Sequence, residues 1–261
     1  MSALPHAGIG SSSQAARLIR ESNLTVALTG AGISTPSGIP DFRTPSAGML
    51  EQGDYTPTLT GFCQDPQAFY DWVRPLARVV MRARPNAAHL ALAEMERRGY
   101  LHAVITQNID LLHSRAGSNK VVEVHGHIRQ ATCLRCYRRY AAEAILARFV
   151  EDGLAPYCTV CGGVLKPDVI LFGEQLPVAA LAESDTLARR CEVMLVAGSS
   201  LEVAPAGELP AVALAAGARL IIVNAEPTAF DREADVVIRA DVAEALPAIQ
   251  AELLMPEPGD A

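Results

Sequence analysis

Short runs of apolar residues recur along the chain, and a polar or glycine-rich cluster follows most of them. The runs lie at residues 24–28, 103–105, 169–172, 193–197, 220–223 and 236–238. Because consecutive positions are apolar, these runs predict strands covered on both faces, as in a parallel sheet. Amphipathic stretches at 14–21, 87–98, 179–190 and 206–216 predict helices between them. The alternation indicates an α/β fold with a doubly wound parallel sheet.

Two segments interrupt this alternation. Residues 44–84 lack a convincing strand pattern, and an aromatic cluster around Tyr70 and Trp72 favours a helix there. Residues 128–166 contain four of the cysteines. We therefore expect a small helical and zinc-ribbon module inserted into the larger domain. The predicted division is 1–43, 85–127 and 167–261 for the sheet domain, and 44–84 and 128–166 for the module.

Four of the six cysteines form two C-x-x-C pairs, Cys133 with Cys136 and Cys158 with Cys161. Each pair can supply two thiolates from one tight turn, and four thiolates complete a tetrahedral zinc site. A coordination sphere filled by sulfur leaves no position for substrate, so the sequence predicts one structural Zn²⁺ per chain. Four free or redox-active cysteines are the alternative, which a chain without an export signal disfavours.

Composition and charge narrow the class of protein. The 261 residues are 50% hydrophobic and 20% charged, which is typical of a globular chain. The formal net charge of −7 argues against nonspecific binding to nucleic acid or to an anionic membrane. No run of about 18 apolar residues predicts a membrane helix, and the N-terminus lacks the features of a secretory signal. We therefore expect a cytoplasmic protein.

Polar clusters stand where predicted strands end, which is where open α/β sheets bind ligands. They are Gly30-Ala31-Gly32-Ile33-Ser34, Thr106-Gln107-Asn108-Ile109-Asp110, Gly198-Ser199-Ser200 and Asn224-Ala225-Glu226. The glycines can let a phosphate approach backbone N–H groups, but Thr35 replaces the third glycine of the dinucleotide fingerprint, and a plain tight turn is the alternative. Asn108 or Asp110 could instead cap a helix.

Two further features carry candidate chemistry. The Gly/Pro-bearing segment that ends in Asp41, Phe42 and Arg43 could form a lid over a charged ligand or a salt-bridged surface loop. His125 follows another short apolar run and could accept a proton from a sugar hydroxyl. Four of the other histidines, His6, His89, His102 and His113, are interpreted as structural, and His125 is favoured over His127.

Together these motifs resemble the sirtuin family of NAD-dependent protein-lysine deacylases, in its prokaryotic form, over about residues 20 to 245. The matching motifs are the glycine turn, Gly38-Ile39-Pro40-Asp41-Phe42-Arg43, Thr106–Asp110, Val124-His125-Gly126, the two C-x-x-C pairs, Phe172-Gly173-Glu174, Gly198-Ser199-Ser200-Leu201 and Val223-Asn224. Leu111 departs from the pattern, because many relatives carry glycine there. The resemblance implies a Rossmann-like large domain and a small zinc-ribbon domain, with NAD and acyl-lysine in the cleft between them.

The resemblance also implies roles for individual residues. His125 would be the general base acting through the ribose hydroxyls, with Asn108 as a second catalytic residue. The expected NAD-binding residues are Gly30, Ala31, Gly32, Thr35, Asp41, Phe42, Arg43, Gln107, Asn108, Ile109, Asp110, His125, Gly198, Ser199, Ser200, Asn224, Glu226, Asp241 and Val242. The expected substrate-binding segment, paired with the peptide as an added strand, is Val169, Ile170, Leu171, Phe172, Gly173 and Glu174.

The expected preference among acyl groups rests on a residue pair that some relatives carry and this sequence lacks. Relatives that remove succinyl or malonyl groups carry a Tyr-x-x-Arg pair, whereas here Tyr70 precedes Arg74 by four residues and Val73 takes the matching place. We expect an uncharged acyl pocket near Trp72 and faster removal of acetyl than of succinyl groups. The expected partners are acyl-lysine-bearing proteins or peptides, without nucleic acid or membrane, and the chain is expected to be a monomer.

Alternatives to deacylation remain open at this stage. Mono-ADP-ribosyl transfer would use the same NAD cleft, and a non-catalytic sensor would bind NAD or acyl-lysine alone. A hydride-transferring dehydrogenase is disfavoured by the incomplete glycine fingerprint and the inserted cysteine module. A zinc-dependent nucleic-acid binder is disfavoured because the arginines near the cysteines form only a modest patch on an acidic chain.

Overall fold

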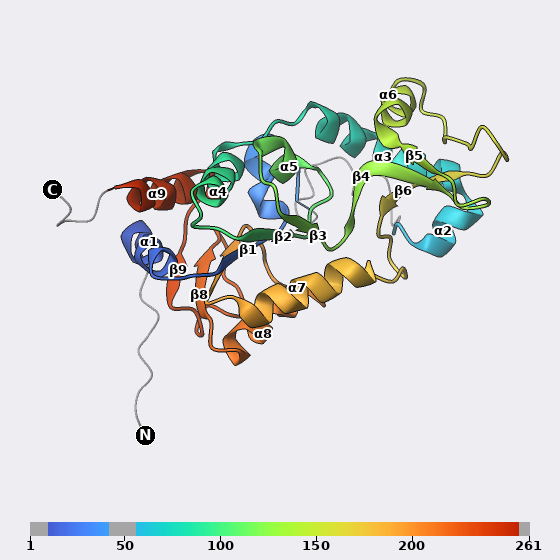
Figure 1. The fold of residues 1–261 in the computed structure, drawn as a ribbon. Coiled ribbons are helices and arrows are strands. Elements are labelled where there is room, and N and C mark those ends of the chain that lie inside the picture. The colour runs from blue at the N-terminus through green and yellow to red at the C-terminus, as the bar shows by residue number, and fades with distance from the viewer. Residues whose placement is uncertain (1–9, 42–55, 256–261) are drawn as a thin grey trace.

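A parallel sheet forms the larger part of the structure, which is a computed structural model and describes residues 10–41 and 56–255. Its six strands lie in the order β3-β2-β1-β7-β8-β9, and all neighbours run parallel (Figure 1). The strands are β1 (Thr25–Thr29), β2 (Ala103–Thr106), β3 (Val121–Glu123), β7 (Val193–Ala197), β8 (Arg219–Val223) and β9 (Val236–Ile238). The strand order reverses between β1 and β7, where Val26 pairs with Ala103 on one side and Met194 on the other. This Rossmann-like order confirms the predicted fold class.

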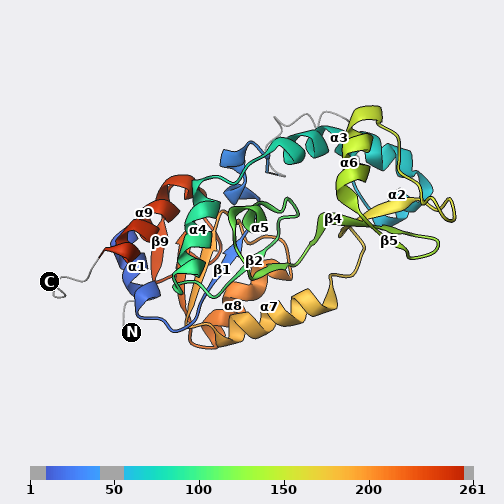
Figure 2. The same cartoon turned by 45° about the horizontal axis from the view of Figure 1, so that its top comes forward.

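Helices cover both faces of the sheet (Figure 2). On one face lie α1 (Ser12–Arg20), α4 (Ala87–Arg97) and α9 (Val242–Leu254), and on the other α7 (Val178–Arg190) and α8 (Leu209–Ala215). Successive strand residues enter opposite cores, so Ala27 packs with the first group and Leu28 with the second. Burial on both faces explains why these strands are apolar at consecutive positions.

Helix α4 is capped by a residue that also holds the turn after β1. Asn86 Oδ1 accepts the Ala88 N–H at 2.9 Å, which satisfies an orphan donor of the first turn. Asn86 Nδ2 donates to the Ile33 carbonyl at 2.8 Å. Two short 3₁₀ turns follow β1, at Ala31–Ile33 and Thr35–Ser37. The cap therefore positions the first of these turns against the sheet domain.

A smaller module lies beside the parallel sheet (Figure 2). Its antiparallel sheet has the order β5-β4-β6, formed by β4 (Gly126–Cys133), β5 (Arg139–Ala141) and β6 (Leu165–Val169). Helices α2 (Leu59–Gln64), α3 (Pro66–Arg82) and α6 (Ala142–Asp152) complete it. Phe62, Phe69, Tyr70 and Phe149 form its aromatic core. The Tyr70 hydroxyl donates to the Leu165 carbonyl at 2.6 Å and ties α3 to β6.

The structure differs from the predicted elements in three places. The run at 169–172 is not a parallel strand, because the strand there is β6, which ends at Val169 and pairs with β4. The strand β3 was not assigned from the sequence, and the predicted helix 206–216 begins as a 3₁₀ turn at Ala206–Glu208. Strands β4 and β6 also run across the domain boundaries expected at 127/128 and 166/167.

Across the two described ranges, no helix combines the length and apolar character that crossing a bilayer requires.

Candidate active site and metal centre

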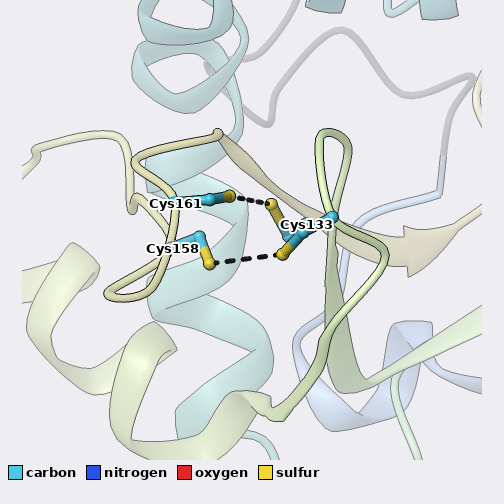
Figure 3. Close-up of side chains that lie close together, drawn as sticks. Cys133, Cys158 and Cys161 are labelled. Atoms are coloured by element: carbon cyan, nitrogen blue, oxygen red, sulfur yellow. Dashed lines mark hydrogen bonds between the residues drawn. The ribbon is translucent and has the colours of Figure 1, made fainter.

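The two C-x-x-C pairs converge in the small module, and Figure 3 labels Cys133, Cys158 and Cys161 of this cluster. All four sulfur atoms lie within 4.8 Å of one another, with 3.4 Å between Cys133 and Cys161 and 3.7 Å between Cys136 and Cys158. Sulfurs bound at about 2.3 Å to a tetrahedral zinc ion would lie about 3.8 Å apart. Sulfurs joined in a disulfide would lie about 2 Å apart. The cluster therefore fits one zinc ion, as predicted.

Nearby donors favour the thiolate form of Cys133 and Cys158. The Arg135 N–H donates to Cys133 Sγ at 3.4 Å, and the Tyr140 hydroxyl lies 2.9 Å from Cys158 Sγ. The contact with Tyr140 lowers the pKa of Cys158 to about 6. The thiolate is the form that binds metal. Four such ligands fill the coordination sphere, which makes the centre structural rather than catalytic.

The turns after β1 and β7 lie directly against each other at the switch point. The Gly32 N–H donates to the Gly198 carbonyl at 2.8 Å. A Cβ atom at Gly198 would lie 2.3 Å from the Ile33 nitrogen, and the Gly198 φ of 61° also favours glycine. Close backbone approach thus accounts for the glycines without a ligand, while their position at the switch point is where dinucleotides bind in such sheets.

Asp110 and Asn108 belong to one buried network beside the first turn. The Ser34 hydroxyl donates to Asp110 Oδ2 at 2.6 Å, and Asn108 Nδ2 donates to Ser34 Oγ at 3.1 Å and to the Gly30 carbonyl at 3.0 Å. Asp110 is 4% exposed and its Oδ1 accepts the Leu112 N–H at 2.8 Å at the start of α5 (Leu112–Ala116). Asp110 Oδ1 therefore bonds the start of α5, much as the capping alternative expected, whereas Asp110 Oδ2 is held by the Ser34 hydroxyl.

His125 stands next to this network on the loop between β3 and β4. Its Nδ1 lies 3.0 Å from the Gln107 carbonyl, and Gln107 Nε2 donates to Ser199 Oγ at 3.0 Å. A carbonyl only accepts, so Nδ1 carries the proton and Nε2 is the acceptor nitrogen of a neutral ring. Burial lowers the pKa of His125, although the bond to Gln107 opposes the shift. The imidazole is therefore neutral near pH 7 and suited to act as a base.

The residue after Asp110 has an unusual backbone conformation. Leu111 has a φ of 66°, in the left-handed region that favours glycine. This is the position at which the sequence departs from the glycine of many sirtuins. The strained residue lies between Asp110 and α5, so the loop that holds Asp110 carries the strain.

Two buried histidines behind Asp110 are not explained by the sequence motifs. The His89 and His113 rings lie 4.8 Å apart, and His113 Nε2 lies 2.9 Å from Thr29 Oγ1. Thr29 Oγ1 donates to Thr106 Oγ1 at 2.9 Å, so the His113 Nε2–H donates to Thr29. Thr106 Oγ1 also accepts the Asn108 N–H at 3.1 Å. These hydrogen bonds connect His113 to the loop of Asn108. The sequence around His113 contains no motif that predicts this connection.

Four of the expected NAD-binding residues, Asn224, Glu226, Asp241 and Val242, lie after β8 and β9. Asn224 Nδ2 donates to the Glu226 carbonyl at 2.8 Å, and Arg239, which the sequence motifs missed, donates to the Glu226 carbonyl at 2.8 Å. Asp241 caps α9 by accepting the Ala243 N–H at 2.7 Å, and the Val242 side chain is buried in the core. For Val242, only the backbone is therefore placed to meet a ligand.

The expected substrate segment is a bend rather than a straight strand. The Ile170 N–H donates to the His125 carbonyl at 3.0 Å, and the Glu174 N–H donates to the Leu171 carbonyl at 3.0 Å, closing a turn. Gly173 has a φ of 85° at the third position of that turn, as a type II turn requires. Phe172 projects from it, 65% exposed. The Glu174 carboxylate binds Lys166, a residue that the sequence motifs did not single out.

The remaining predicted NAD-binding residues lie in several different parts of the structure. The Thr35 hydroxyl donates to the Gly32 carbonyl at 3.0 Å, and Ile109 packs against the aromatic core of the small module. Ala31 lies in the turn after β1, Ser200 in the turn after β7, and Asp41 at the end of the first described range. Phe42 and Arg43 lie outside the described residues.

Comparisons with known proteins identify the class. The Sir2 family model matches residues 30–205, so this chain belongs to the Sir2 family. A Thermotoga maritima NAD-dependent protein deacetylase is 44% identical over 87% of this chain and 92% of its own. An Archaeoglobus fulgidus NAD-dependent protein deacylase is 45% identical over 92% of this chain and 95% of its own.

Solved structures agree. A Sir2 complex with a p53 peptide and NAD⁺ matches with a TM-score of 0.83 and 42% identity, covering 92% of this chain and 97% of that one. A Sir2 structure bound to a propionylated peptide matches with a TM-score of 0.82 and 41% identity, over 92% and 97% of the two chains. The fold of this chain is therefore that of the family over most of its length.

Proposed function

We propose that this protein is an NAD-dependent deacylase of protein lysines, and that acetyl-lysine is its main substrate. The products would be nicotinamide, 2′-O-acyl-ADP-ribose and free lysine. One observation carries the proposal: His125, oriented by the Gln107 carbonyl, lies beside the network of Asn108, Ser34 and Asp110 at the switch point. The names of the Thermotoga maritima and Archaeoglobus fulgidus relatives support it.

The residues at the switch point fit a dinucleotide. The turns that carry Gly30, Gly32 and Gly198 pack closely against each other at the switch point, and Gln107 and Ser199 offer hydrogen-bonding groups for a ribose. Asp110, fixed by Ser34, would hold the nicotinamide amide, and Asn224 and Glu226 would meet the adenosine half. When bound, NAD supplies an electrophilic ribose carbon and a nicotinamide leaving group.

His125 would act as the general base. Its Nδ1–H is held by the Gln107 carbonyl, which leaves Nε2 to take a proton from a ribose hydroxyl. Asn108 would orient the site through its bonds to Gly30 and Ser34. Because a protonated imidazole cannot accept this proton, turnover should fall as the pH is lowered through the pKa of His125, which burial holds below its ordinary value.

A product assay tests the function. The protein would be incubated with NAD and matched acetyl-, succinyl- and myristoyl-lysine peptides, and the products identified by mass spectrometry. We expect O-acyl-ADP-ribose and nicotinamide, with acetyl removed faster than succinyl because Val73 and Trp72 leave no Tyr-x-x-Arg pair. A peptide that keeps its acyl group while protein side chains gain ADP-ribose would show mono-ADP-ribosyl transfer instead.

The His125→Ala variant tests the mechanism. We expect turnover to fall by about 100-fold or more, which is the range for a lost general base. Zinc content and unfolding temperature should stay near those of the unaltered protein, since His125 is only half-buried. Normal turnover in this variant would remove His125 from the mechanism.

The remaining proposals concern the protein as a whole. We infer a cytoplasmic monomer that binds acyl-lysine segments of other proteins and no sequence-specific nucleic acid. The domain division at 1–43, 85–127 and 167–261 against 44–84 and 128–166 stays a proposal, and limited proteolysis would test it. Sedimentation at several concentrations would test the monomer.

A further inference from the structure

A buried ion pair lies inside the segment expected to bind the peptide. Lys166 Nζ lies 3.1 Å from Glu174 Oε2, and the two side chains are only 9% and 16% exposed. Burying two charges is costly, and apolar residues of similar size are often at least as stabilising. The pair therefore calls for an explanation other than stability alone.

The Lys166 ammonium donates to three acceptors, which are two backbone carbonyls and one carboxylate oxygen. Besides Glu174, it donates to the Val169 carbonyl at 2.7 Å and the Pro167 carbonyl at 3.1 Å. An ammonium has three donors, so all of them are used. Pro167 and Val169 belong to the end of β6, whereas Glu174 closes the turn beyond it. Lys166 thus ties that turn to the end of the strand.

The carboxylate acts on the turn itself. Glu174 Oε2 also accepts the Leu171 N–H at 2.7 Å, next to the bond from the Glu174 N–H to the Leu171 carbonyl. The Phe172 N–H donates to the Pro57 carbonyl at 3.0 Å, and its carbonyl accepts the Leu59 N–H at 3.1 Å. The turn is therefore held between the start of α2 on one side and the ion pair on the other.

The segment leads directly to the predicted base. The Ile170 N–H donates to the His125 carbonyl, so the backbone of His125 and the bend at 171–174 are separated by one residue. A shift of the bend would change how a peptide laid along it meets His125. The fixed bend and the predicted base thus share one short stretch of backbone.

The choice of lysine supports a specific geometry. The chain has 22 basic residues, and only Lys120 and Lys166 among them are lysines. A guanidinium presents its donors in a planar fork, whereas an ammonium is a compact charge with three donors arranged around one atom. Three acceptors converging on one buried point match the ammonium.

We propose that Lys166 and Glu174 are positioning residues that hold the 170–174 bend in the shape that receives the acyl-lysine peptide. This rests on the proposed deacylase function. Glu174, which the resemblance places among residues that touch the substrate, would act through the bend instead. If the pair has this role, its loss should raise the KM for the peptide and leave the KM for NAD almost unchanged.

The experiment compares four variants with the unaltered protein: Lys166→Met, Glu174→Gln, the double variant of both, and Lys120→Met as the control at the other, exposed lysine. Steady-state kinetics would give KM for an acetyl-lysine peptide and for NAD separately. Unfolding temperature would report stability, and hydrogen exchange would report protection of the Leu171 amide.

We expect Lys166→Met to raise the peptide KM by about tenfold and to leave the NAD KM within about twofold, because ground-state peptide binding is what is lost. Its unfolding temperature should fall because Glu174 is left as an unpaired buried charge. The double variant removes both charges, so it should regain most of the unfolding temperature but keep the raised peptide KM. Lys120→Met should change neither KM.

Two outcomes would overturn the proposal. If the double variant regains the peptide KM together with stability, the pair is only structural. If Lys166→Met raises both KM values alike, the pair does not act selectively on the peptide segment. Should the unaltered protein form no acylated product at all, the deacylase function fails. Hydrogen exchange at Leu171 would then still show whether Lys166 holds the bend, and unchanged protection in Lys166→Met would exclude that.

Discussion

Three residues near Asp110 are in conformations or surroundings that lower the stability of the folded protein. Leu111 holds a left-handed backbone conformation, which costs a residue with a Cβ atom about 1–2 kcal/mol relative to glycine. His89 and His113 are buried as a pair with no ion pair of their own among the described residues. Leu111 follows Asp110 in the same loop, and the hydrogen bonds of His113 lead to Asn108 through Thr29 and Thr106. The strained residue and the buried pair are the kind of local cost that accumulates at functional sites.

Replacing Leu111 with glycine should relieve its backbone strain. The partly buried leucine side chain is lost in the same change, so Leu111→Ala is the matched control, since alanine loses the side chain but keeps the strain. We expect Leu111→Gly to be more stable than Leu111→Ala by about 1 kcal/mol in denaturant unfolding. Equal stability of the two variants would show that the position carries no strain.

The buried histidines predict how stability depends on pH. Burial lowers the pKa of His113 to about 3 and that of His89 to about 4, against an ordinary value of 6.5. Between pH 6.5 and 4 the unfolded chain therefore binds protons that the folded chain does not. Stability is full above pH 6.5 and falls as the pH is lowered, by up to about 1.4 kcal/mol per pH unit for each histidine.

The His113→Gln variant isolates one of these protons. Glutamine can still donate to Thr29, so the variant should fold, with a lower stability at pH 7 but a shallower loss between pH 6 and 4. The difference in slope from the unaltered protein should be about 1 kcal/mol per pH unit. His102→Gln, at an exposed histidine, serves as the control. An unchanged slope in His113→Gln would contradict the buried, neutral state of His113.

At the scale of elements, apolar runs were sufficient to predict five of the six parallel strands because these strands are buried on both faces. The run at 169–172 failed for a physical reason. Lys166 is buried inside β6 and interrupts the apolar pattern, so the apolar run begins four residues after the strand does. The contact between the turns after β1 and β7 was also invisible, because it joins residues far apart in the sequence and uses backbone atoms only.

The contact between these two turns can be tested with a pair of glycine variants. Gly198 and Gly217 both have a positive φ, but only a Cβ at Gly198 would meet backbone, whereas Gly217 faces open space. Alanine at either position is strained because of the positive φ. Alanine at 198 must also push the two turns apart, which should lower the stability by about 1–3 kcal/mol more. We expect Gly198→Ala alone to lose NAD affinity in calorimetry. Equal loss in Gly217→Ala would mean that the close approach is not what forms the site.

At the scale of the whole molecule, the chain forms two sheets with different means of stabilisation. The parallel sheet has large apolar cores on both faces, while the small module has an aromatic core and only a few buried residues around the cysteine cluster. The sequence could predict that the cysteines bind one metal ion, because their spacing is specific. It could not predict that Tyr70 would join α3 to β6, since that bond spans 95 residues.

Removing the zinc ion should therefore act locally. We expect one zinc per chain by elemental analysis, and we expect a strong chelator or Cys136→Ser to release the order of residues 133–165 in hydrogen exchange while the parallel sheet stays protected. Cys63→Ser, at an exposed cysteine outside the cluster, is the control. Loss of protection throughout the parallel sheet would show instead that the two sheets unfold as one.

The position of β1 also has a consequence for biosynthesis. β1 is the first strand of the parallel sheet to leave the ribosome, yet its partner β7 begins 168 residues later, as Thr25 pairs with Val193. At about 5–20 residues per second, one edge of this apolar strand waits roughly 8–34 s for its neighbour. The described part of the small module is translated within that interval. A nascent chain has therefore synthesised the described residues of the small module while one edge of β1 is still unpaired, the situation in which a chaperone that covers β1 would matter most.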